Sequence, residues 1–312
     1  MAFVTGASRG IGSACAVELA RRGFDVALSA RTLHEGERRE HSSTLARSDC
    51  SPLPGSLSTP ARRVEEAGGR ALVVPADLLD RAALVAAAER VIARWGRVDC
   101  LVSNARYVGP GHMDRLLDTP LERIEDHLRA NVLAPLALIQ HLLPAMIRNG
   151  GGTIIVVTSA SGYTDPPAAA GEGGWGVGYG ASKAAAHRIP GILSAEHARD
   201  GIRAFLLHPG LTASERIAAD MKEFGFEGGA PVEVTAKVVG WLATSPEADA
   251  LTGTNLEAQF LCHERGLLPG WPGPTPNPHP LRYDRSGARL EELEAALRRS
   301  ISRDGTGAAS ES

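Results

Sequence analysis

A tyrosine and a lysine stand four residues apart in the segment Tyr179-Gly180-Ala181-Ser182-Lys183. On a helix this spacing brings a phenol and an ammonium to the same face. A phenol has a pKa of about 10 and is a poor base at neutral pH, but a nearby ammonium favours the phenolate and lowers that pKa. We therefore expect Tyr179 to give a proton to a carbonyl, or to take one from an alcohol, while a hydride moves. The same lysine can hold ribose hydroxyls.

A serine precedes this pair, directly after the apolar and β-branched run at residues 153–158. An uninterrupted run of this kind predicts a strand that is buried on both faces. A side chain at the carboxyl end of such a strand points into the ligand crevice of a parallel sheet. The Ser159 hydroxyl is thus expected to hydrogen bond a substrate oxygen. A Tyr-Lys pair also arises by chance, so its weight depends on the elements around it.

Short apolar runs alternate with amphipathic stretches of helical length. The runs predict strands at residues 2–4, 26–30, 71–75, 98–103, 153–158 and 203–208. The stretches predict helices at 13–22, at 79–95, at 121–147 and at 179–199, with one more ending at residue 67. This alternation predicts an α/β fold, a Rossmann-type doubly wound parallel sheet with helices on both faces.

Three stretches interrupt the alternation, and one of them, the Gly-, Ala- and Pro-rich segment 164–178, lies just before Tyr179. Residues 32–59 are rich in Ser, Arg, Glu and Pro, which predicts an inserted, mobile loop. Residues 268–283 have the proline content of an extended linker. Beyond them, Leu290, Leu293 and Leu297 fall on one face of a short predicted helix, before a tail expected to be disordered. We expect one catalytic domain over residues 1–267 and an extension over 268–312.

The first predicted strand leads into a glycine-rich turn, Thr5-Gly6-Ala7-Ser8-Arg9-Gly10-Ile11-Gly12, and then a helix. Glycine permits a tight turn and lets the backbone approach a pyrophosphate closely. The helix that follows offers free N–H groups and the positive end of its dipole to phosphates. A plain turn is the alternative, but a strand before and a helix after favour a dinucleotide site.

The second predicted strand ends in Leu28-Ser29-Ala30-Arg31, without a carboxylate. An NAD site usually has an acidic residue here for the ribose hydroxyls, whereas Arg31, helped by Arg9, suits a 2'-phosphate. We therefore predict NADP ahead of NAD; a surface arginine without a ligand is the alternative. Asp77 and Leu78 follow the third strand, where Asp77 can reach the adenine or, equally well, cap a helix.

Composition excludes several classes of function. The formal net charge of -3 provides no basic field for nucleic acid. No run approaches ~20 apolar residues, so we predict no membrane span. The four cysteines are scattered, without metal-ligand spacing, which predicts reduced thiols, no metal site and a cytoplasmic location.

In their order along the chain, these motifs resemble those of the short-chain dehydrogenase/reductase family. The matching residues are Thr5-Gly6-x3-Gly10-x-Gly12, Asn104-Ala105, Asn131, Ser159 and Tyr179-x3-Lys183, within about residues 1–256. The resemblance implies that Ser159, Tyr179 and Lys183 are catalytic and that Asn131 holds a water linking Lys183 to solvent; a polar residue that kinks a helix is the alternative for Asn131. It also implies that Asn104 lines the adenosine pocket, that Pro209-Gly210 borders the nicotinamide, and that the protein is a homodimer or homotetramer.

The sequence departs from the family pattern in several places. The family's Asn-Asn-Ala-Gly segment reads Ser103-Asn104-Ala105-Arg106, which changes the expected shape of that loop. The stretch between Ser159 and Tyr179 is longer than usual, and its excess at 164–178 is expected to loop over the substrate entrance. Thr212 and Ser214 both qualify to bind the carboxamide. Three apolar residues suggest a lid, although packing residues look the same: Met221, Phe224 and Phe226.

These observations lead to one main hypothesis, an NADP-dependent carbonyl reductase or alcohol dehydrogenase acting on a small carbonyl or alcohol. A second hypothesis is a regulatory or scaffold protein that binds the dinucleotide without turnover. An intact Ser-Tyr-Lys set argues against the second, since a protein without turnover has no need of it. A third, that the predicted helix of the extension makes this chain a docking subunit, is weaker.

Overall fold

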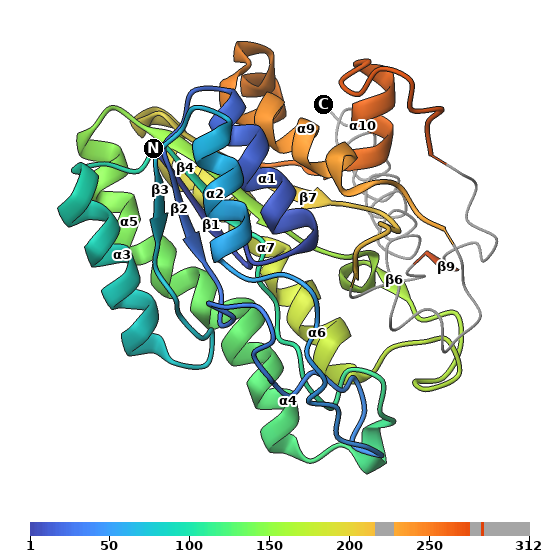
Figure 1. Ribbon diagram of the computed structural model, residues 1–312. Coiled ribbons are helices and arrows are strands. Elements are labelled where there is room, and N and C mark those ends of the chain that lie inside the picture. Colours follow the sequence, from blue (N-terminus) through green and yellow to red (C-terminus); the bar gives the residue numbers. More distant parts are fainter. Residues whose placement is uncertain (216–227, 275–281, 284–312) are drawn as a thin grey trace, which may run out of the picture.

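A seven-stranded parallel sheet forms the centre of the computed structural model, which describes residues 1–215, 228–274 and 282–283 (Figure 1). Its strand order is β3-β2-β1-β4-β5-β7-β8. The strands are β1 (Ala2–Thr5), β2 (Val26–Ser29), β3 (Ala71–Val73), β4 (Cys100–Ser103), β5 (Gly152–Val157), β7 (Ile202–His208) and β8 (Asn255–Glu257). The order reverses between β1 and β4, so the prediction of a doubly wound sheet is confirmed.

Helices cover both faces of the sheet (Figure 1). On one side lie α1 (Gly10–Arg21), α2 (Ser58–Glu66), α9 (Val232–Thr244) and α10 (Ala258–Glu264). On the other lie α3 (Arg81–Trp95), α5 (Ala134–Arg148) and α7 (Arg188–His197). Two further helices, α4 (Leu121–Leu128) and α6 (Val177–Ala186), pack together beyond the carboxyl edge of the strands.

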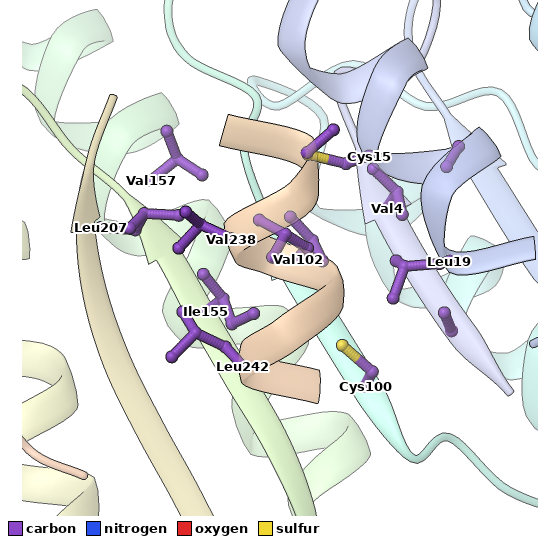
Figure 2. Packing of buried hydrophobic residues seen from close by; sticks show 14 of the residues in the cluster. Val4, Cys15, Leu19, Cys100, Val102, Ile155, Val157, Leu207, Val238 and Leu242 are labelled. Carbon is purple, nitrogen blue, oxygen red and sulfur yellow. The ribbon is translucent and has the colours of Figure 1, made fainter. Parts of the chain in front are cut away.

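Each central strand contributes to both hydrophobic cores, because successive side chains point to opposite faces. In β1, Val4 joins the core under α1 and α9, whereas Phe3 joins the core under α3 and α5. Figure 2 shows the first core, in which Val238 and Leu242 of α9 lie close to Ile155 and other side chains of the sheet. Burial on both faces explains the uninterrupted apolar runs in the sequence.

Two predicted helices are interrupted in the structure. The stretch predicted over 121–147 is α4, a π-helical turn at Arg129–Leu133, and α5. The stretch predicted over 179–199 begins earlier, at α6, and divides into α6 and α7 at His187. By length and composition the 121–148 stretch is also the one described helix that could cross a membrane, and half of its apolar window is buried inside the protein.

The segment between β2 and α2 is irregular, as predicted, but it packs closely against the domain. The Leu57 N–H donates to the Thr32 carbonyl over 3.0 Å and closes the base of this segment, which we call the insertion (residues 32–57). Both Ser42 and Leu57 are buried. The prediction of a mobile loop over 32–59 was therefore wrong in two respects: its last residues belong to α2, and its middle is packed into the protein.

The segment between Ser159 and Tyr179 contains a two-residue strand, β6 (Thr164–Asp165), which pairs antiparallel with β9 (Arg282–Tyr283). The described part of the extension thus returns to this segment. Leu268 and Trp271 pack on the first core, which continues past the predicted boundary at 267. The extent of the domain stays a prediction. The residues predicted for a lid and for a leucine face lie outside the described residues: Met221, Phe224, Phe226, Leu290, Leu293 and Leu297.

Candidate active site

A cavity of about 330 Å³ opens where the strands end at their carboxyl edge. Most residues predicted for the site line it. They are Gly6, Ser8, Arg9, Gly10, Ile11, Gly12, Arg31, Asp77, Leu78, Asn104, Ala105, Ser159, Tyr179, Lys183, Pro209 and Gly210. Two predicted residues, Asn131 and Thr212, do not line it. Residues separated by most of the chain therefore meet in one cavity.

The glycine-rich turn forms a cradle that no larger residue would fit. A Cβ on Gly12 would lie 2.2 Å from the Gly6 carbonyl oxygen, and Gly6 itself has a φ of +67°. Helix α1 starts at Gly10, and the side chain of its N-cap, Arg9, makes no capping hydrogen bond. The N–H groups of the first turn have no acceptor within the helix, and they belong to residues that line the cavity. This arrangement fits a pyrophosphate.

Asn104 holds the glycine turn in place. Its Nδ2 donates to the carbonyls of Thr5 and Gly6 at 3.0 and 3.3 Å. The Thr5 hydroxyl in turn accepts from the backbone N–H groups of Asn104 and Ala105, both at 3.1 Å. Sequence analysis missed this role of Thr5, because a threonine at a strand end carries no distinctive signal.

The adenosine end of the cavity carries charges of both signs. Arg31 lies 3.9 Å from Asp77, and the insertion adds Arg39 and Glu37 to the lining. The Glu37 carboxylate accepts from Leu33 N–H at 2.9 Å and pairs with Arg39 at 2.9 Å. The lack of a carboxylate at the end of β2 is thus partly offset by one that arrives from the insertion.

Asp77 does not cap a helix. Its Oδ1 accepts from the Leu79 N–H at 2.9 Å, while the N-cap of α3 is Asp80, whose side chain accepts from Ala83 N–H. The capping alternative considered for Asp77 was wrong.

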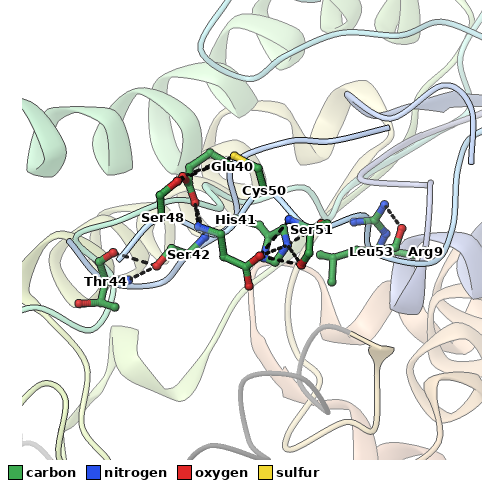
Figure 3. A network of polar contacts seen from close by, with 10 residues as sticks. Arg9, Glu40, His41, Ser42, Thr44, Ser48, Cys50, Ser51 and Leu53 are labelled. Atoms are coloured by element: carbon green, nitrogen blue, oxygen red, sulfur yellow. Dashed lines mark hydrogen bonds and ion pairs between the residues drawn. The ribbon is translucent and has the colours of Figure 1, made fainter. Parts of the chain in front are cut away.

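Arg9 holds the insertion through one end of its guanidinium. Its Nη2 donates to the Gly55 carbonyl at 2.7 Å. The same atom lies 3.5 Å from the Leu53 carbonyl oxygen (Figure 3). Desolvation by burial lowers the pKa of this guanidinium. Arg9 also lines the cavity, and its buried Nε has no hydrogen-bond partner among the described residues, so its assistance in binding a 2'-phosphate stays a prediction.

A polar network fixes the rest of the insertion (Figure 3). The Glu40 carboxylate accepts from the backbone N–H groups of Ser42 and Asp49 at 2.8 and 3.0 Å. His41 Nε2 lies 2.9 Å from the Ser51 carbonyl oxygen. Six insertion residues line the cavity as a result: Thr32, Glu37, Arg39, His41, Ser51 and Leu53. The sequence predicted the insertion but not that it forms a wall of the site.

Tyr179 and Lys183 lie on α6 and both line the cavity. Lys183 is buried, and its Nζ donates to the Val157 carbonyl at 3.3 Å. Desolvation, followed by the positive charge of Arg106, lowers the pKa of Lys183 to about 7. The strand end and the helix thus position the ammonium together.

Ser159 lies directly after β5 and caps a short 3-10 turn, its Oγ accepting from the Ser161 N–H at 3.3 Å. The long stretch to Tyr179 folds back onto the site, because the Gly176 N–H donates to the His112 carbonyl at 2.7 Å. Ser159 and Tyr179 therefore line the same cavity despite the extra residues between them.

Asn131 connects structural elements at the π-helical turn. Its Oδ1 accepts from the Tyr107 N–H at 2.7 Å, and its Nδ2 donates to the Ser182 hydroxyl at 2.9 Å. These bonds support the alternative of a polar residue at a helix distortion. The role of Asn131 in a water relay stays a prediction.

The choice between the two hydroxyls after Pro209-Gly210 is decided by position. Thr212 is buried, with its Oγ1 3.3 Å from the carbonyls of Pro209 and Gly210. Ser214 lines the cavity and lies against Gly10, where a Cβ would be 3.2 Å from the Ser214 Cβ. Of the two hydroxyl residues that the sequence left open, Ser214 is therefore the one that lines the cavity.

Three side chains that sequence analysis did not assign surround the tyrosine. The His112 imidazole lies over the Tyr179 ring with centroids 4.0 Å apart, and the Arg106 guanidinium lies 5.9 Å from the same centroid. His127 is buried, and its ring centroid lies 6.4 Å from that of Tyr179. Neither of its ring nitrogens has a hydrogen-bond partner within the described chain. Desolvation lowers the pKa of His127 to about 4, so it is neutral at pH 7.

A second polar group adjoins Ser159. Tyr163 Oη lies 3.0 Å from His208 Nδ1 and also donates to Glu257, which pairs with His208. His208 lines the cavity directly before Pro209. No spacing in the sequence connects these residues, since they come from three separate elements.

The profile of the short chain dehydrogenase family matches residues 1–47 and 48–223, well over half of the chain. The chain belongs to the short-chain dehydrogenase/reductase family. The resemblance found in the sequence is therefore confirmed, and with it an oxidoreductase with a nicotinamide dinucleotide site.

Relatives within the family use either form of the cofactor. An uncharacterized NAD-dependent oxidoreductase of Mycobacterium tuberculosis is 32% identical over 220 residues, which is 67% of this chain and 70% of that protein. A short chain dehydrogenase from Mycobacterium paratuberculosis bound to NAD is 26% identical, with a TM-score of 0.65 over 82% of this chain and 94% of the other. A 3-oxoacyl (acyl-carrier-protein) reductase from Agrobacterium tumefaciens with NADP bound is 25% identical, with a TM-score of 0.65 over 82% and 91% of the two chains.

Proposed function

We propose that this protein is an NADP-preferring oxidoreductase that interconverts a small carbonyl compound and the corresponding alcohol. The observation that carries the proposal is the meeting of Ser159, Tyr179 and Lys183 with the glycine cradle in one cavity. When bound, the nicotinamide dinucleotide accepts or supplies the hydride.

The side chains of the site divide the remaining work. The Ser159 hydroxyl donates to the substrate oxygen and orients it. The Tyr179 hydroxyl gives that oxygen its proton in reduction and takes the proton back in oxidation. The Lys183 ammonium stabilises the phenolate that forms when the proton leaves. The glycine turn and the N-terminus of α1 hold the pyrophosphate.

The preference for NADP rests on the cations at the adenosine end. Arg31 lines the cavity at the end of β2, and Arg39 reaches the same region from the insertion. A 2'-phosphate would compete with Asp77 for Arg31 and with Glu37 for Arg39. These two carboxylates limit the preference for NADP, and the family contains relatives with NAD and with NADP. The quantity to measure is therefore the ratio of kcat/KM for NADPH to that for NADH.

The test is the oxidation of NADPH and of NADH, followed by absorbance, against a panel of ketones and aldehydes. We expect turnover with a kcat/KM at least about tenfold higher for NADPH, the worth of a charge-assisted contact. In Arg31→Ala the NADPH value falls toward that of NADH, while the NADH value changes little. A wild-type preference for NADH would reject the cofactor assignment but not the oxidoreductase. The matched control is Arg129→Ala, since Arg129 is an arginine that does not line the cavity.

The alternative is a regulatory or scaffold protein that binds the dinucleotide without turnover. Calorimetric binding of NADPH together with the absence of product from the whole panel would favour it. The presence of Ser159, Tyr179 and Lys183 in one cavity supports the enzyme.

We also propose that the protein is cytoplasmic and assembles into homodimers or homotetramers, without nucleic acid or membrane partners. The assembly is supported by large apolar side chains that are exposed near α4, among them Leu117 at 98% and Leu121 at 72% exposure. The location is supported by the free cysteines, because unpaired thiols are usual in a reducing compartment. Light scattering of the purified chain measures its mass, and a mass of one chain would reject the assembly.

A further inference from the structure

The end of the cavity where the reaction would occur has a surplus of positive charge. Arg106 and Lys183 both line the cavity beside Tyr179. The described carboxylates that line it lie elsewhere: Glu37 and Asp77 at the adenosine end, and Glu215 beside Gly10 of the phosphate turn. Nearby, Glu257 is paired with His208. Among the residues that the structure describes, no carboxylate that lines the cavity lies beside the cations around the tyrosine.

Arg106 is the cation of this cavity to which the proposed function assigns no part in catalysis or in binding the dinucleotide. Its Nη1 donates to the Tyr107 carbonyl at 3.0 Å and lies 3.5 Å from His112 Nδ1. Within residues 1–215 and 228–274, no carboxylate lies within ion-pair distance of it. A guanidinium has five N–H donors arranged as a fork, so most of this capacity is left for a ligand.

The loop after β4 is built to present this side chain. Arg106 stands where the family pattern has glycine, yet none of the described non-glycine residues has a positive φ, so the backbone accepts a side chain here without strain. The same loop carries His112, whose ring lies over Tyr179. Asp114 fixes the loop by accepting from Gly111 N–H at 2.8 Å. Arg106 and His112 therefore lie beside the reacting hydroxyl on a braced loop.

We propose that Arg106, with His112 beside it, forms a subsite for a carboxylate of the substrate, so that the preferred substrates are oxo acids or hydroxy acids. The planar fork of a guanidinium matches the two oxygens of a carboxylate. A cofactor phosphate has the same chemistry, but the glycine cradle and the N-terminus of α1 already provide for it. The inference rests on the proposed function and adds the class of its substrate.

The experiment compares acids with their own esters. Kinetics with NADPH are measured for 2-oxobutanoate, 4-oxopentanoate and their methyl esters. We expect the better acid to exceed its ester in kcat/KM by about tenfold to a hundredfold, the worth of a charge-assisted hydrogen-bonded pair. In Arg106→Met the acid loses this advantage while the ester changes less than about threefold. Arg106→Lys keeps the charge but not the fork, and should retain an intermediate preference.

Arg39→Met is the matched control, since it removes another cation from the same cavity but at the adenosine end. It should alter the KM for NADPH and leave the ratio of acid to ester unchanged. Three results would overturn the subsite: a wild-type preference for the esters, an equal loss for acid and ester in Arg106→Met, or a loss confined to the KM for NADPH. The last would assign Arg106 to a cofactor phosphate.

A failure of the proposed function gives a different result. If the wild-type protein turns over none of the four compounds, calorimetry of the NADPH complex with butanoate and with butanamide still tests the subsite. Binding of butanoate alone, lost in Arg106→Met, would support the subsite. Equal binding of both compounds, or of neither, would reject it.

Discussion

The Thr44 hydroxyl donates to the Asp114 carboxylate over 2.6 Å, joining the insertion to the loop that carries Arg106 and His112. The Leu45 N–H adds a bond of 3.0 Å to the same carboxylate, which is buried. One acidic side chain thus connects the wall of the adenosine end to the surroundings of the tyrosine.

Replacing this carboxylate should loosen both parts. Asp114→Ala removes the acceptor of the bonds from Thr44, Leu45 and Gly111, and we expect a loss of about 2–4 kcal/mol in the free energy of unfolding. The KM for NADPH should rise as well, because the insertion lines the cavity. Urea unfolding and cofactor titration measure the two effects. Thr44→Val removes a single bond and should cost only about 1 kcal/mol; equal losses in the two variants would contradict this account of Asp114.

Tyr179→Phe should reduce kcat by about a hundredfold to ten-thousandfold, since it removes the proton donor and little volume. Cofactor binding should be nearly unchanged, because the glycine cradle lies elsewhere in the cavity. The measurements are steady-state kinetics and a fluorescence titration with NADPH. A variant that keeps more than a tenth of the wild-type kcat would remove Tyr179 from the reaction.

Gly12→Ala should weaken NADPH binding by about tenfold to a hundredfold, since the new Cβ would meet the Gly6 carbonyl at 2.2 Å and force the turn open. The control is Gly191→Ala in α7, where the nearest atom is 3.9 Å away. It should leave binding unchanged and raise stability by up to about 1 kcal/mol. Unimpaired binding in Gly12→Ala would show that the turn is not the phosphate cradle.

The buried His127 should make the protein sensitive to acid. Its pKa is lowered by burial from 6.5 to about 4 in the folded state, so the unfolded chain binds more protons between these values. The contribution of the neutral His127 to the free energy of unfolding is on the order of 3 kcal/mol. It is fully present above pH 6.5 and is lost as the pH falls toward 4.

The check is the unfolding free energy against pH in wild type and in His127→Leu. We expect a flatter profile for the variant across this window. His187, whose pKa is also lowered to about 4, keeps part of the slope. Parallel profiles would show that His127 does not titrate as its burial requires.

The sequence by itself determined six of the seven strands of the sheet, all but β8, together with the phosphate turn and the Tyr179–Lys183 pair. These features follow from residues that are close in the sequence: apolar runs, glycine at a turn between a strand and a helix, and an i, i+4 spacing. Such rules do not fix helix interruptions, because the π-helical turn at Asn131 is stabilised by partners at Tyr107 and Ser182, distant in the chain.

Only the tertiary structure decided which side chains share the cavity with Tyr179. Arg106, His112 and the insertion reach it through irregular loops, whose paths are fixed by contacts such as Thr44 with Asp114 rather than by any periodicity. The same folding occupied Arg9 with the Gly55 carbonyl and brought Glu37 to the adenosine end. The electrostatic potential at the site depends on how far each charged residue lies from it. The sequence gives the charged residues, but only the folded structure gives their distances.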